Sequence, residues 1–161
     1  MEPRITFAEF PEGLYPLMRN IEVYLKKTIP HPFIGLIKMR ASQINGCGYC
    51  LDMHYKESTK AGETNQRLYL LPAWKESPVY TEQEKAVLNL TDTLTKISEK
   101  EPEEVEKAYD IMAKHFSKQE IANFVLAICQ IHSWNRLSIT FGNIPGSYQV
   151  ESIETKKEVL L

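Results

Sequence analysis

The chain has 161 residues, of which 43% are hydrophobic and 25% are charged, and its formal net charge at pH 7 is −2. This length corresponds to one domain with a sizeable core. The small net charge excludes a broad electrostatic attraction to nucleic acid or to an anionic membrane, so we expect neither as a partner. The longest apolar run, Phe124 to Cys129, is too short to cross a bilayer. Because the chain opens without the apolar segment of a secretion signal, we expect a cytoplasmic protein.

The chain is predicted to consist of an arm, a helical domain and a tail. Residues 1–12 carry two prolines and no clear period, which predicts an extended N-terminal arm packed on a neighbouring surface. Beyond them, apolar residues recur at intervals of three and four, the spacing of helices that bury one face. This spacing, with proline, glycine and capping signals, predicts helices over residues 13–27, 30–44, 47–60, 65–71, 81–97, 102–115 and 119–140.

No stretch of the sequence alternates with a period of two, so the fold class is predicted to be all-α. We expect a single-domain helical bundle over residues 13–145, followed by a charged tail, 146–161, that is disordered or docks on another subunit. The charge-rich segment from Lys96 to Lys107 is expected to be a solvated loop and helix start rather than a docking patch.

The helix over residues 119–140 is the most apolar predicted element. It is apolar on nearly all sides, which predicts a central buried helix or one at a subunit contact. Cys129 lies in its apolar run and is expected to pack as a small hydrophobe. His132 and the segment Trp134-Asn135-Arg136 either line a functional site or an interface, or are polar residues that end the helix.

Two cysteines and a histidine form the most distinctive motif. Cys47 and Cys50 are three residues apart and His54 follows four residues later, so on one helix all three share a face. Helical residues three apart have Cα atoms about 5 Å from each other, a separation that a disulfide tolerates. The turn signal Asn45-Gly46 places the thiols near a helix N-terminus, whose free N–H groups favour thiolate. Since His54 can hold or donate a proton beside Cys50, the motif predicts thiol redox chemistry.

Two other interpretations of the motif stay open. Two thiolates and an imidazole are three zinc ligands, but a structural zinc site needs a fourth, and His31, His115 and His132 are scattered singly. The cysteines could also be incidental, with His54 a core side chain. We expect redox chemistry ahead of both, with no metal and no cofactor, and three cysteines in a reducing compartment argue against a structural disulfide framework.

The motif and its surroundings resemble the AhpD-like alkylhydroperoxidases of the carboxymuconolactone decarboxylase superfamily. The Cys-x-x-Cys-x-x-x-His signature at Cys47, Cys50 and His54 is specific to that branch, and the resemblance covers most of residues 14–145. It is carried by residues 39–54, 61–64, 67–69, 73–78, 81–84 and 134–137.

The resemblance implies an all-helical fold, assembly into homo-oligomers (a dimer, trimer or hexamer), and reduction of a peroxide substrate by the cysteine pair. It assigns attack on the peroxide to Cys50, resolution to Cys47 and proton handling to His54. Position at the helix N-terminus alone would nominate Cys47 as the attacking thiol. We follow the family, because His54 is one helical turn from Cys50.

The chain departs from the family pattern at two positions. Where the best-studied members carry a glutamate twelve residues before the first cysteine, this chain has Gly35, and Tyr49 stands where they have a histidine. The family's proton relay is therefore expected to be incomplete. Gln43 can form hydrogen bonds but cannot titrate, and His31, one turn from Gly35, is a conjectural substitute.

The sequence thus predicts a thiol-dependent peroxidase that cycles between dithiol and disulfide and is restored by an external dithiol reductant. The alternative is a redox-responsive oligomeric protein or a disulfide oxidoreductase without peroxidase turnover. Lactone decarboxylation is disfavoured, because that chemistry has no use for a dithiol.

Overall fold

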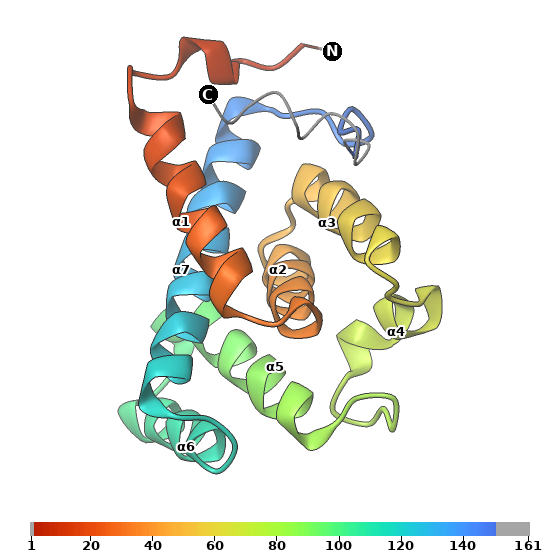
Figure 1. Ribbon diagram of the computed structural model, residues 1–161, viewed down its shortest axis with the longest axis vertical. Coiled ribbons are helices and arrows are strands. Elements are labelled where there is room, and N and C mark those ends of the chain that lie inside the picture. Colours follow the sequence, from red (N-terminus) through yellow and green to blue (C-terminus); the bar gives the residue numbers. More distant parts are fainter. Residues whose placement is uncertain (1, 151–161) are drawn as a thin grey trace.

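Helices make up all the regular structure of residues 2–150, the part of the chain that the computed structural model describes. The all-α prediction is therefore confirmed (Figure 1). Part of the predicted tail, residues 151–161, and Met1 of the arm lie outside the described residues. The α-helices are α1 (Leu14–Thr28), α2 (His31–Asn45), α3 (Gly48–Lys60), α4 (Asn65–Leu70), α5 (Glu82–Thr95), α6 (Pro102–Ala113) and α7 (Lys118–Phe141). Short 3-10 turns add η1 (Phe7–Glu9), η2 (Leu71–Ala73) and η3 (Ile97–Glu99).

The helix starts follow the capping signals in the sequence. Thr81 and Ser117 accept hydrogen bonds from the backbone N–H groups of Glu84 and Glu120, at 3.2 and 3.3 Å, as their capping boxes predicted. The arm contains the turn η1, which its lack of a clear period did not predict. Within residues 2–150, no helix is long and apolar enough to cross a membrane.

Helix α2 occupies the centre of the bundle, where it contacts α1, α3, α5 and α7 (Figure 1). Its buried side chains Ile34, Ile37 and Ala41 join those of the surrounding helices in one hydrophobic core. The helix predicted over residues 119–140, α7, contacts α1, α2, α3, α5 and α6, so α2 and α7 share the centre, and a subunit contact for α7 stays a prediction. Because α2 is enclosed on several sides, its polar side chains Lys38 and Ser42 are buried with it.

Helix α7 has an exposed side as well as a buried one. Phe124, Ile128 and Ile131 are buried in the core, whereas Leu126 is 38% exposed. The prediction that Cys129 packs as a small hydrophobe is wrong, because its side chain is exposed. At 3.6 residues per turn, position 129 turns away from the side that carries 124, 128 and 131, so an apolar sequence here did not mean burial.

The end of α2 is fixed in place by a buried amide. Asn135 of α7 is 1% exposed; its Nδ2 donates to Ser42 Oγ at 3.0 Å, and its Oδ1 accepts from Asn45 Nδ2 at 2.9 Å. Immediately after this contact, Gly46 ends α2 with φ 68°, a left-handed conformation that favours glycine. The chain then reverses into α3, so this junction sets where Cys47 lies.

We expect Asn135→Ala to lower the free energy of unfolding by about 1–3 kcal/mol, because it leaves buried Ser42 and Asn45 without a partner. Urea unfolding followed by circular dichroism measures the loss. Arg136→Ala, at the neighbouring exposed position, is the control and should change stability by less than about 0.5 kcal/mol. Equal effects of the two changes would contradict a structural role for the amide.

Candidate active site

The two cysteines of the motif lie at the start of α3 and form a disulfide. Cys47 is the N-cap residue, its Sγ accepts the backbone N–H of Cys50 at 3.3 Å, and the two Cα atoms are 5.3 Å apart. This separation agrees with the spacing argument. Both side chains are 1% exposed, so the sulfurs are covered by other parts of the chain.

A cavity of about 130 Å³ lies beside the disulfide and is lined by Cys50 and His54. The α3 side chains Tyr49 and Glu57 contribute to its wall, and α7 contributes Trp134. Of the two cysteines, Cys50 is the one that lines the cavity. A small molecule in this cavity would therefore meet the sulfur of Cys50.

The imidazole of His54 is 4% exposed, and its Nδ1 lies 3.0 Å from Glu57 Oε2. Burial lowers the pKa of His54 below its ordinary value of 6.5, although the hydrogen bond with Glu57 opposes this shift. The ring is thus neutral at pH 7, with Nδ1–H donating to the carboxylate. Its Nε2 then carries a lone pair, and this buried atom has no hydrogen-bond partner among residues 2–150.

The carboxyl of Glu57 is kept ionised by the groups around it. Burial alone would raise its pKa, but the hydrogen bond with His54 and the charges of Lys26 and Lys38 outweigh burial and bring the pKa far below its ordinary value. Lys26 Nζ lies 3.4 Å from Glu57 Oε1, and the hydroxyl of Tyr148 donates to the same oxygen at 3.4 Å. Glu57 therefore holds His54 in one orientation and one tautomer.

A buried ion pair between Glu22 of α1 and Lys38 of α2 completes the polar wall of the cavity. The indole N–H of Trp134 donates to the other carboxylate oxygen of Glu22 at 3.0 Å. Neither charged residue was singled out from the sequence. A signal was present, because Glu22 falls on the apolar stripe between Met18 and Leu25, and a charge on such a stripe is unusual unless it is paired.

The N-terminal arm forms another wall of the cavity. Arg4 donates from its backbone N–H to Phe141 O at 2.6 Å and from its side chain to the carbonyl oxygens of Thr140 and Ile139 at 2.8 and 2.9 Å. The arm is thus attached to the last turn of α7, as Figure 1 shows. Phe7 then packs against Trp134, with ring centroids 6.3 Å apart, and lines the cavity.

Comparison with known proteins assigns the chain to a family. The profile of the carboxymuconolactone decarboxylase family matches residues 14–93. The uncharacterized protein YdfG of Bacillus subtilis (strain 168) is 42% identical over 146 residues, which cover 89% of this chain and 97% of YdfG. The chain belongs to the carboxymuconolactone decarboxylase family.

Solved structures place the chain more closely within the family. A crystal structure from Agrobacterium tumefaciens, described as a protein of unknown function and a candidate AhpD antioxidant defence protein, is 40% identical with a TM-score of 0.82, and the match covers 93% of this chain and all of that one. The AhpD-like resemblance is therefore confirmed. The debrominase Bmp8, in complex with 2,3,4-tribromopyrrole, matches with a TM-score of 0.73 over 83% of this chain and 71% of its own. At 17% identity, this likeness shows the fold alone.

Gly35, at the position of the family's glutamate, lies where α2 packs against α3. A Cβ atom added there would come within 3.1 Å of the Oγ of buried Ser58, so a larger side chain would crowd the contact. A hollow of about 580 Å³ borders Gly35 and His31 and shares Lys38, His54 and Glu57 with the smaller cavity. The carboxylates near His54 thus come from Glu57 and Glu22 instead.

Of the other residues considered from the sequence, Tyr49 lies at the cavity beside Cys50, whereas Gln43 and His132 do not. Tyr49 lines the cavity, and burial raises the pKa of its phenol, so it stays protonated at pH 7. Gln43 does not line the cavity, although its Oε1 is buried without a hydrogen-bond partner in the described part of the chain. His132 pairs with Thr95 at 3.0 Å, away from the cysteines. Among residues 2–150, no three His, Cys, Asp or Glu side chains converge as metal ligands would.

We expect His54 to titrate below its ordinary pKa, and Glu57→Gln to lower this pKa further, because the carboxylate of Glu57 raises it. An NMR titration of the ring measures both values. Glu63→Gln, which removes a carboxylate paired with Arg67, is the control and should leave the His54 pKa unchanged.

Since the unfolded chain binds the proton more readily, His54 also makes stability fall as the pH drops below about 6.5. A pKa above the ordinary value would contradict the neutral ring.

We expect Lys38→Met to lower the free energy of unfolding by about 3–5 kcal/mol, because it leaves the carboxylate of Glu22 buried without its cation. Adding Glu22→Gln removes that charge and should restore most of the loss. Chemical denaturation of the two single variants and the double variant measures this coupling. Additive losses in the double variant would show that the two side chains act independently.

Proposed function

We propose that the protein is a thiol-dependent peroxidase of the AhpD-like type. One observation carries the proposal: Cys50, half of a Cys-x-x-Cys disulfide, shares a cavity with His54, whose buried Nε2 has no hydrogen-bond partner in residues 2–150. A thiol needs a base within reach to become a nucleophile at neutral pH. The likeness to the Agrobacterium protein described as a candidate AhpD supports the same reaction class.

In the reduced state, Nε2 of His54 takes the proton of the Cys50 thiol, and the thiolate attacks the O–O bond of the peroxide. The S–O bond forms as the O–O bond breaks, and the leaving oxygen takes the proton from His54 and departs as an alcohol or as water. Cys47 then attacks the sulfenic acid, forming the S–S bond and releasing water. An external dithiol reductant restores both thiols by exchange.

The charged residues around the cavity prepare these steps. Burial and the ammonium group of Lys38 both lower the pKa of His54, and the pair of Lys38 with Glu22 places charges of both signs in the wall that faces Cys50. Glu57 orients His54 so that Nε2, rather than Nδ1, is the free nitrogen. With Gly35 at the family's glutamate position, Glu57 and Glu22 supply the negative charge that stabilises His54 once it is protonated.

The external reductant also needs access to the buried sulfurs. Because both sulfurs are 1% exposed, the reductant reaches them only when part of the cover moves. Phe7 of the arm is part of this cover. We also propose that the protein works as a cytoplasmic homo-oligomer, as the family resemblance implies.

We expect reduced protein to lose two of its three thiols when hydrogen peroxide or tert-butyl hydroperoxide is added, leaving Cys129 free. Cys50→Ser should abolish the reaction, Cys47→Ser should stop at a sulfenic acid on Cys50, and His54→Gln should slow attack by roughly 10²–10⁴. Thiol counting and mass spectrometry with a sulfenic acid trap measure these outcomes. Cys129→Ser is the control and should react like the unaltered protein. The proposal fails if Cys50→Ser loses thiols as fast as the unaltered protein does.

A second candidate function is dithiol exchange without peroxidase turnover, which could change the assembly of the protein. Gly35 and Tyr49 favour it, because they replace two groups of the family's relay. With excess dithiothreitol, a peroxidase consumes many equivalents of peroxide for each chain, whereas this alternative consumes about one. Size-exclusion chromatography of oxidised and reduced protein then reveals any change in assembly.

A further inference from the structure

We propose that the protein has a second binding site, for a small molecule with two or more phosphate or carboxylate groups. The site is a hollow of about 400 Å³ between α2, α5, α6 and the loop that follows η2. It shares no lining residue with the dithiol cavity. Arg40 and Ile44 of α2 line this hollow, whereas Lys38 of the same helix lines the dithiol cavity. The inference therefore does not depend on the proposed function.

The acidic side chains of the hollow are already paired. Arg40 binds Asp92 through Nε and Nη2 at 2.6 and 3.1 Å, and the indole N–H of Trp74 donates to the same carboxylate at 3.1 Å. Lys100 Nζ lies 2.7 Å from Glu104 Oε1. These contacts neutralise both carboxylates among the lining residues, so neither is available for a further cation.

Three ammonium groups then remain around the hollow, on Lys75, Lys96 and Lys107. Lys96 has only a loose contact with exposed Glu99, at 3.7 Å. Lys75 Nζ lies 5.5 Å from the centre of the Trp74 ring. Neither Lys75 nor Lys107 forms an ion pair with any of residues 2–150. All three side chains are exposed, so water and salt screen their mutual repulsion, and their summed positive charge attracts an anion to the hollow.

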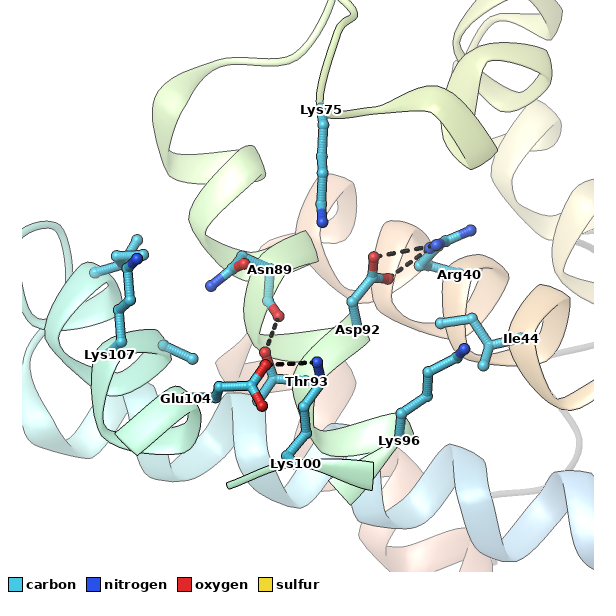
Figure 2. Close-up of a pocket in the computed structure, with 12 residues that line it drawn as sticks. Arg40, Ile44, Lys75, Asn89, Asp92, Thr93, Lys96, Lys100, Glu104 and Lys107 are labelled. Carbon is cyan, nitrogen blue, oxygen red and sulfur yellow. Dashed lines mark hydrogen bonds and ion pairs between the residues drawn. The ribbon is translucent and has the colours of Figure 1, made fainter. Parts of the chain in front are cut away.

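The lysines come from different elements and surround the same space. Figure 2 shows the side chain of Lys75 extending toward Asp92 from one side, and those of Lys96 and Lys100 approaching from the opposite side. An anion between them would contact ammonium groups from the loop and from the end of α5 together. Lys107 of α6 lies to one side of this group, beyond Asn89 (Figure 2).

The size and lining of the hollow restrict the ligand class. A volume of about 400 Å³ falls in the range of small-molecule sites, roughly 300–1,000 Å³. Ile44, Ala108 and Ile111 provide the apolar part of the lining, which also accommodates a ligand with a small apolar portion. The charges surround a concave space rather than form an exposed stripe, which favours a compact multivalent anion over a nucleic acid backbone.

Isothermal titration calorimetry with pyrophosphate and with citrate tests the proposal and distinguishes phosphate from carboxylate ligands. We expect binding of at least one probe, weakened by salt, and at least tenfold weaker in the variant Lys75→Ala, Lys96→Ala, Lys107→Ala. The matched control Lys27→Ala, Lys114→Ala, Lys118→Ala removes the same charge from exposed positions elsewhere and should bind like the unaltered protein. Circular dichroism checks that both variants are folded.

Three results would overturn the proposal. The first is that neither probe binds at low salt. The second is that both triple variants weaken binding equally, which would show a general effect of net charge. The third is that a single-stranded oligonucleotide binds more tightly than either probe and loses affinity in the first variant, which would identify a nucleic acid surface instead. Replacing the same three lysines by arginine should retain binding.

Discussion

The junction between α2 and α3 is the constraint on which the dithiol depends. Asn135 fixes the last turn of α2 from the side of α7, and Gly46 reverses the chain in a conformation that favours glycine. Cys47 must then start α3, and Cys50 follows one turn later with its Cα 5.3 Å away. The disulfide is thus compatible with an undistorted helix. In the proposed cycle, reduction and oxidation would therefore require little backbone movement.

The same helix brings charge into the interior. Because α2 is enclosed by its neighbours, Lys38 cannot reach water and is paired with Glu22. A buried pair of this kind adds little net stability, since desolvation offsets the attraction. It does, however, place a cation and a carboxylate in the wall of the Cys50 cavity. The position of the pair beside Cys50, rather than its contribution to stability, gives a reason for its presence.

The sequence predicted the helices and the dithiol motif because both depend on contacts between residues close in the chain. Capping boxes, glycine ends and the spacing of Cys47, Cys50 and His54 are all local. The polar wall of the cavity is not local, because Glu22 and Trp134 meet across 112 positions. The exposed side of α7 was missed for a related reason: its sequence is apolar on nearly all sides, but the neighbours of a helix decide how much of it is buried. Exposed Cys129 follows from the same fact.

Gly35 connects the packing of the bundle with its chemistry. A Cβ atom at this position would come within 3.1 Å of Ser58 Oγ, so a glutamate there would require that side chain to shift. The carboxylate that contacts the histidine instead lies three residues after it, where a helix places Glu57 within reach of Nδ1 on the same side. Nε2 of His54 then has no hydrogen-bond partner among residues 2–150, and in the proposed mechanism this nitrogen of the neutral ring is the base for Cys50. His54 therefore has an acidic partner although position 35 is glycine.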